Sequence, residues 1–139
     1  MAPDRSVSES SMNWSEMSLH LEARASQIAA ARNWVAAQAL ENGVAGDRIP
    51  LLKLLASELV TNAVLHGPAN GPLTVRVSTS DGQLRVEVDD EGLDPPQLRD
   101  PTATEMGGRG MILLARFSTR WSWDRRASGG KTVWFDFPL

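Results

Sequence analysis

The sequence contains no cysteine and only two histidines in its 139 residues. Without cysteine there is no disulfide and no thiolate metal site, and two histidines are too few for a histidine-rich zinc site. An excess of positive charge is also missing, because the formal net charge is -3 at pH 7. Proteins that hold phosphate backbones need a basic surface, so we expect no direct nucleic-acid partner.

Long apolar runs are lacking as well. The opening residues, MAPDRSVSESSMNWSEMS, have no apolar core of the kind found in a secretory signal. No later stretch approaches the roughly 20 apolar residues of a membrane span. We therefore expect a cytoplasmic protein without a membrane partner. Its length and its 42% hydrophobic content suit one domain, which we place at residues 17–139 after a flexible leader at residues 1–16.

The apolar patterning predicts an α+β fold, with helices on one face of a mainly antiparallel sheet. Residues 17–23 alternate enough for a short strand, although they can equally begin the next helix. We expect Ser26 and Asp47 to cap the first two helices. The expected order is a helix from residue 26 to a stop at Gly43, a helix over 47–65, a hairpin over 72–90, a loop over 91–108, a helix over 108–121 and a hairpin over 121–137.

The helical stretch SELVTNAVLHG carries Glu58, Asn62 and His66 at four-residue intervals. Residues at this spacing lie on one face of a helix. The amide oxygen of Asn62 can bind Mg²⁺, which takes a few protein oxygens together with phosphate and water. Glu58 can accept a proton from an attacking hydroxyl. The alternative from the helix alone is a solvated polar face, which is the commoner case.

Two further motifs are an acidic turn and a glycine-rich turn. Asp90 and Gly92 lie where a strand opens into a loop, and a carboxylate there can accept hydrogen bonds from the amine of adenine. An ordinary Asp/Gly turn is the alternative. In GGRGMILLA, glycines precede a helix, so free N–H groups and Arg109 can bind an anion.

Thr132, in GGKTVWF, is the last candidate. An inward hydroxyl can bond a base or a bridging water, although strand threonines more often reflect β propensity alone.

In their order and spacing, ELVTNAVLHG, DDEG, GGRGMILL and GGKTVWF resemble the Bergerat-type ATP-binding fold of the GHKL superfamily. That superfamily includes histidine kinases, gyrase-type ATPases and anti-sigma serine kinases. The likeness is closest to small bacterial regulators similar to anti-sigma factor serine/threonine kinases. It implies a two-layer α/β sandwich, often dimeric, that binds a sigma factor and phosphorylates a serine of an anti-anti-sigma partner.

The resemblance also implies a role for each motif residue. Asn62 would hold Mg²⁺ against the phosphates of ATP, Glu58 would be the general base, and His66 would lie near the phosphates. Asp90 would recognise the adenine amine and Gly92 would flank the base.

The remaining implied roles concern the phosphates and the far side of the base. Residues 93–107 would form a lid over ATP, and Thr132 would complete the adenine pocket. The phosphate contacts implied by the second glycine box are Gly108, Arg109 and Gly110.

One departure from the family pattern is clear. The first glycine box commonly reads Asp-x-Gly-x-Gly, whereas here Asp94 replaces the second glycine and adds a negative charge. Two functions therefore stay open: a serine/threonine protein kinase, and an ATP-responsive binding module with little or no kinase activity. A sensor histidine kinase is less favoured, because His20 lies in a segment too short for a dimerising helical hairpin.

Overall fold

The computed structural model describes residues 15–96 and 110–139. Within these ranges the chain forms one five-stranded sheet in the order β1-β2-β3-β5-β4, with every neighbouring pair antiparallel. This confirms the predicted α+β fold. The elements are β1 (Ser15–Glu22), α1 (Ile28–Glu41), α2 (Ile49–His66), β2 (Pro72–Ser80), β3 (Gln83–Asp90), α3 (Gly110–Phe117), β4 (Arg120–Arg125) and β5 (Lys131–Pro138).

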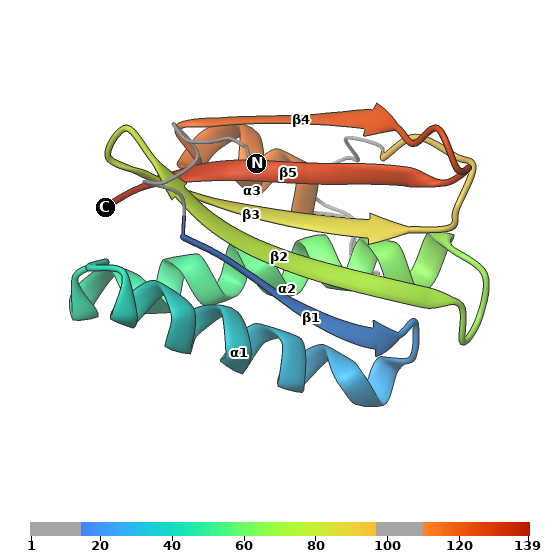
Figure 1. Cartoon of the computed structure of the whole chain (residues 1–139), viewed down its shortest axis with the longest axis horizontal. Coiled ribbons are helices and arrows are strands. Elements are labelled where there is room, and N and C mark those ends of the chain that lie inside the picture. The colour runs from blue at the N-terminus through green and yellow to red at the C-terminus, as the bar shows by residue number, and fades with distance from the viewer. Residues whose placement is uncertain (1–14, 97–109) are drawn as a thin grey trace, which may run out of the picture.

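The helices cover one face of this sheet (Figure 1). Alternate residues of each central strand are buried against them, as the two-residue period of a strand requires. In β5 the buried aromatic side chains are Phe135 and Phe137, and they meet Leu52 and Leu55 of α2 in a single apolar core. The predicted two-layer arrangement follows from this alternation.

Helix α2 is the central helix of that core. The segment Gly46–His66 is long and apolar enough to cross a membrane by length and composition, contrary to the expectation that no such stretch exists. Its apolar length has another explanation here, because its buried residues include Leu52, Leu55, Leu59 and Val60. A helix buried between a sheet and a neighbouring helix needs apolar residues on more than one side.

The helix starts differ from the prediction. Ser26 and Asp47 were expected to cap, but each lies inside a short 3-10 turn, and neither α1 nor α2 has a side-chain cap. Of the ambiguous residues 17–23, all but Ala23 form strand, which runs over Ser15–Glu22 and so includes the end of the expected leader.

The third helix is shorter than expected. It ends at Phe117, and β4 begins at Arg120, whereas the helix was predicted to reach residue 121. The hydroxyl of Ser118 donates to the carbonyl of Leu114, and the amide of Thr119 donates to the carbonyl of Asp136 at 2.8 Å. The second bond turns the backbone into the sheet.

The face of the sheet that the helices leave open carries charged side chains. Asp136 accepts two bonds from Arg85, at 2.8 and 3.0 Å, and two from Arg120, at 3.1 and 3.3 Å. Arg85 also stacks on Trp134, with its guanidinium carbon 3.8 Å from the ring centroid. Burial opposes ionisation of Asp136, but the hydrogen bonds and the charges of both arginines outweigh it, so the pKa of Asp136 lies below its ordinary value.

Strand β1 lies at one edge of the sheet, and the side chain of Met17 on it is half exposed. An uncovered edge can pair with a strand of another molecule. The family resemblance implies a protein that is often dimeric, and pairing across a two-fold axis at this edge would form such a dimer; dimerisation stays a prediction.

Asp136→Asn should lower the free energy of unfolding at neutral pH by about 1–3 kcal/mol, because it removes a charged acceptor from two arginines. A lowered carboxyl pKa stabilises the fold above the unfolded value of 3.8 and is lost as the pH falls through the lower folded value. The difference between variant and wild type should therefore shrink below that pH. Urea unfolding across this pH range measures the difference in free energy of unfolding, and the exposed-site variant Asp47→Asn is the control. A difference that does not change with pH would contradict the prediction.

Candidate functional site

Three segments meet where β3 ends. These are the C-terminal end of α2, the turn after β3 and the first residues of β5. Contact at Gly92 is so close that an added Cβ would lie 2.9 Å from the carbonyl oxygen of His66 and 3.1 Å from the Cα of Gly67. The structure therefore brings the backbone of His66, at the end of the helical motif, beside Gly92 of the acidic turn. Only glycine fits there without a shift of the helix end.

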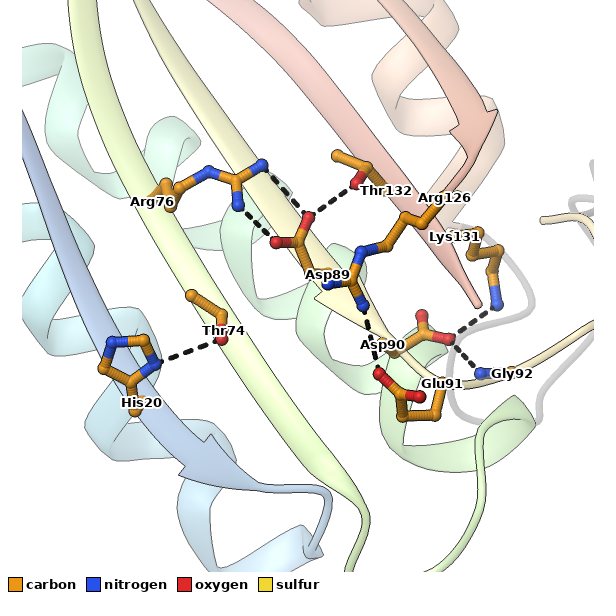
Figure 2. A network of polar contacts seen from close by, with 10 residues as sticks. All are labelled: His20, Thr74, Arg76, Asp89, Asp90, Glu91, Gly92, Arg126, Lys131 and Thr132. Carbon is orange, nitrogen blue, oxygen red and sulfur yellow. Dashed lines mark hydrogen bonds and ion pairs between the residues drawn. The ribbon is translucent and has the colours of Figure 1, made fainter. Parts of the chain in front are cut away.

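Asp90 is the central side chain of this region. Its Oδ1 accepts a bond from the amide of Gly92 at 2.6 Å and another from the ammonium of Lys131 at 3.1 Å (Figure 2). Both charged side chains are almost fully buried, with 2% of Asp90 and 1% of Lys131 exposed. The second oxygen, Oδ2, is buried and has no hydrogen-bond partner in the described part of the chain.

Burial dominates the ionisation of Asp90. It raises the pKa of the carboxyl above the ordinary value, although the charge of Lys131 and the hydrogen bonds from Gly92 and Lys131 act in the opposite direction. Glu91 adds a smaller repulsion of the same sign as burial. Asp90 thus depends on its few donors for the stability of its charged form.

Thr132 lies away from Asp90. Asp90 is paired with Lys131 and Asp89 with Thr132, so the two pairs point to opposite faces of the sheet. The hydroxyl of Thr132 donates to Oδ1 of Asp89 at 2.6 Å, and Asp89 also pairs with Arg76 on the open face (Figure 2). The structure does not bring Thr132 into the pocket expected for it.

Lys131 occupies the place beside Asp90 and was missed from the sequence. A signal for it was present, because Lys131 shares the two-residue phase of Val133, Phe135 and Phe137, which are the buried side of β5. A lysine in that phase must be buried and therefore needs an acidic partner.

The polar residues of α2 lie on the approach to this region. Asn62 is 4% exposed, one turn before His66, and both Glu58 and His66 are half-buried. Their spacing places all three along one face of the helix, as predicted. The polar face is thus largely withdrawn from solvent, unlike the solvated face that was the alternative.

The glycine-rich anion motif falls mainly outside the described residues. Gly108, Arg109 and residues 97–107 of the expected lid lie there, while Gly110 is the first residue of α3. At the start of that lid, the carbonyl of Leu93 accepts a bond from Arg125 at 2.9 Å. Asp94, which departs from the family pattern, is exposed, so solvent screens its charge.

The chemistry of Asp90 fits an adenine base. A buried carboxylate oxygen without a partner is costly, and an exocyclic amine is a donor that would satisfy it. The described residues contain no cluster of three or more His, Cys, Asp or Glu side chains for a metal. A Mg²⁺ ion held with nucleotide phosphates needs few protein ligands, and an amide oxygen such as that of Asn62 is one of the accepted kinds.

A family model and several known proteins are similar to this chain. A family model of the histidine kinase-like ATPase domain matches residues 21–137. The anti-sigma F factor of Geobacillus stearothermophilus is 31% identical over 130 residues, which cover 86% of this chain and 89% of that protein. The anti-sigma F factor of Clostridium botulinum (strain Eklund 17B / Type B) is 30% identical over 113 residues, covering 73% and 79%.

Two solved structures share the fold. The RsbU and RsbW domains of Rv1364c from Mycobacterium tuberculosis superpose with a TM-score of 0.66 at 20% identity, over 90% of this chain and 32% of that one. The histidine kinase domain of the blue-light activated kinase EL346 from Erythrobacter litoralis gives a TM-score of 0.52 at 26% identity, over 81% and 61%.

Gly130→Ala should destabilise the protein more than Gly129→Ala. Both glycines have positive φ, at +79° and +98°, so each variant loses about 1 kcal/mol from backbone strain. At Gly130 the new Cβ would also lie 2.1 Å from the carbonyl oxygen of Asp90, whereas Gly129 faces open space. This clash should add about 1–3 kcal/mol. Urea unfolding of both variants measures the difference, and equal losses would contradict the predicted contact.

Proposed function

We propose that this chain, which belongs to the histidine kinase-like ATPase domain family and is a relative of the anti-sigma F factors, is an ATP-binding regulator that acts in the cytoplasm. In this proposal it binds a sigma factor and phosphorylates a serine of an anti-anti-sigma protein. The observation that carries it is the buried carboxylate of Asp90, whose Oδ1 accepts from the amide of Gly92 and whose Oδ2 has no partner in the described part of the chain.

Base recognition is assigned to the end of β3. Asp90 would accept the adenine amine, a donor that guanine replaces with a carbonyl oxygen, so ATP should be preferred over GTP. Gly92 would let the backbone approach the flat base. This part of the proposal rests on the close contact of Gly92 with the end of α2.

Phosphate handling is assigned to α2 and to the glycine-rich turn. Asn62 would supply an amide oxygen to Mg²⁺, and His66 would lie near the phosphates. Gly108, Arg109 and Gly110 would contact them below the lid, as the family resemblance implies. Bound Mg-ATP supplies the phosphoryl group and its charge neutralisation, and Glu58 would take the proton from the serine hydroxyl.

An ATP-responsive module without kinase activity is the second candidate. Asp94, in place of a family glycine, favours it, because this position loses backbone freedom next to the lid. Because Asp94 is exposed, its charge has a limited effect on ATP. ATP binding would therefore persist, while the positioning of ATP for phosphate transfer would become poorer.

Asn62→Ala should weaken Mg-ATP binding by about tenfold or more, because it removes an oxygen ligand of the ion. Affinity for ATP with EDTA should change much less. Calorimetric titration of folded protein measures both, and Asn33→Ala, an exposed asparagine on α1, is the matched control. Equal losses with and without Mg²⁺ would remove Asn62 from metal binding.

Glu58→Gln should retain ATP binding and lower phosphate transfer to the anti-anti-sigma protein by about 100-fold or more, because an amide cannot take a proton. Transfer of labelled γ-phosphate to the partner serine measures this. Glu41→Gln, at the exposed end of α1, is the control.

Three results separate the candidates. Undiminished transfer by Glu58→Gln would rule out Glu58 as the base. Wild-type protein that transfers no phosphate, but binds its partner with an affinity that ATP changes, would favour the second candidate. Equal partner affinity with and without ATP would leave no switch of either kind.

A further inference from the structure

We propose that Lys131 is a positioning residue for base selection: by holding Oδ1 of Asp90, it leaves Oδ2 as the single acceptor for an exocyclic amine. The inference rests on the proposed ATP-binding function and adds to it a specificity determinant on β5. It starts from an ion pair between two side chains that are both almost fully buried.

The contacts divide the two oxygens of Asp90. Oδ1 accepts from the ammonium of Lys131 at 3.1 Å and from the amide of Gly92 at 2.6 Å, while Oδ2 has no partner in the described residues. Two donors at one oxygen fix the orientation of the carboxylate, because any intermediate orientation loses these two hydrogen bonds. Asp90 is thereby held so that Oδ2 is the oxygen available to a donor group of a ligand.

The backbone makes this arrangement rigid. Lys131 stands opposite Asp90 in the β3–β5 register, and Gly130 passes so close to the carbonyl of Asp90 that no side chain fits between them. Arg126 adds a second link across the same strand ends, with its Nη1 3.0 Å from Oε2 of Glu91. Lys131 therefore reaches Asp90 from a fixed position.

Stability alone does not explain the pair. A buried ion pair roughly balances its desolvation cost, and an apolar pair of similar size is often as stable. An unsatisfied oxygen beside it adds a further cost. A ligand that donates to Oδ2 would remove that cost, which gives the pair a function in recognition.

Loss of Lys131 would change the acceptor itself. Burial already favours the protonated form of Asp90, and Lys131 provides the main opposing charge. Without it, Asp90 would bind a proton more readily and only the amide of Gly92 would hold Oδ1, so the bond of Asp90 to an amine would become one between neutral groups. Such bonds are about half as strong as charged ones.

The test compares ATP with purine riboside triphosphate, which lacks the 6-amino group. Wild-type protein should bind Mg-ATP tighter than the Mg-bound analogue by about tenfold or more, the value of a hydrogen bond to a charged acceptor. In Lys131→Met the ratio should fall towards one. Lys53→Met removes the only other lysine and should keep the wild-type ratio. Circular dichroism and thermal melting establish that each variant is folded.

The outcomes are distinct. A ratio of the two nucleotide affinities that falls towards one in Lys131→Met, but not in Lys53→Met, supports the inference. An unchanged ratio with weaker binding of both nucleotides shows a merely structural role and overturns it. Wild-type protein that binds neither nucleotide overturns the proposed function, whereas wild-type protein that binds both equally overturns only the base selection.

A second measurement needs no variant that must fold. With ¹⁵N-labelled lysine, the two ammonium groups of the protein give separate signals, and the buried one should exchange its protons slowly. That protection should persist when Mg-ATP is bound, because Oδ1 stays with Lys131. Loss of protection on binding would mean that the ion pair opens, and the inference would fail.

Discussion

The antiparallel pairing of β5 between β3 and β4 is the constraint on which the rest of the structure depends. It joins the β2–β3 hairpin to β4, the strand that follows α3, and so places the core helices against one continuous sheet. It also sets Lys131 against Asp90 and Thr132 against Asp89. A single set of backbone hydrogen bonds thus completes the core and positions the residues of the candidate site where β3 ends and β5 begins.

The two faces of the sheet use their charges differently. On the open face, Asp136 is surrounded by arginines that are partly solvated, and their charges lower its pKa. On the helix face, Asp90 has one lysine and one backbone donor, and burial raises its pKa. The first carboxylate is satisfied within the protein. The second has one oxygen without a partner among the described residues. This is the difference expected between a structural group and a recognition group.

Much of the fold could be predicted from local pattern. The strict alternation over residues 72–90 predicts the β2–β3 hairpin. The structure places its turn at Asp81 and Gly82, with φ of 52° and 75°. Capping was less predictable, because Ser26 and Asp47 are good cap residues whose positions became 3-10 turns. In the candidate site, Asp90 and Gly92 could be named as candidates because they lie in one turn, two residues apart. The burial of Lys131 could be predicted from its phase in β5, but its pairing with Asp90 could not, because that partner lies 41 residues away and depends on strand register.

The turn between β4 and β5 has a consequence for sequence change in this protein. The amide of Arg126 donates to the carbonyl of Gly130, and the amide of Gly129 donates to the carbonyl of Arg126. These bonds close the turn, and two glycines with positive φ give it a fixed length. A slip of β5 by one residue would exchange its faces, sending lysine to the solvent and threonine into the core. Substitutions at the exposed positions of this turn are therefore tolerable, whereas insertion or deletion of one residue is not. At those exposed positions the number of residues matters more than their identity, whereas the positive φ of Gly129 and Gly130 requires glycine.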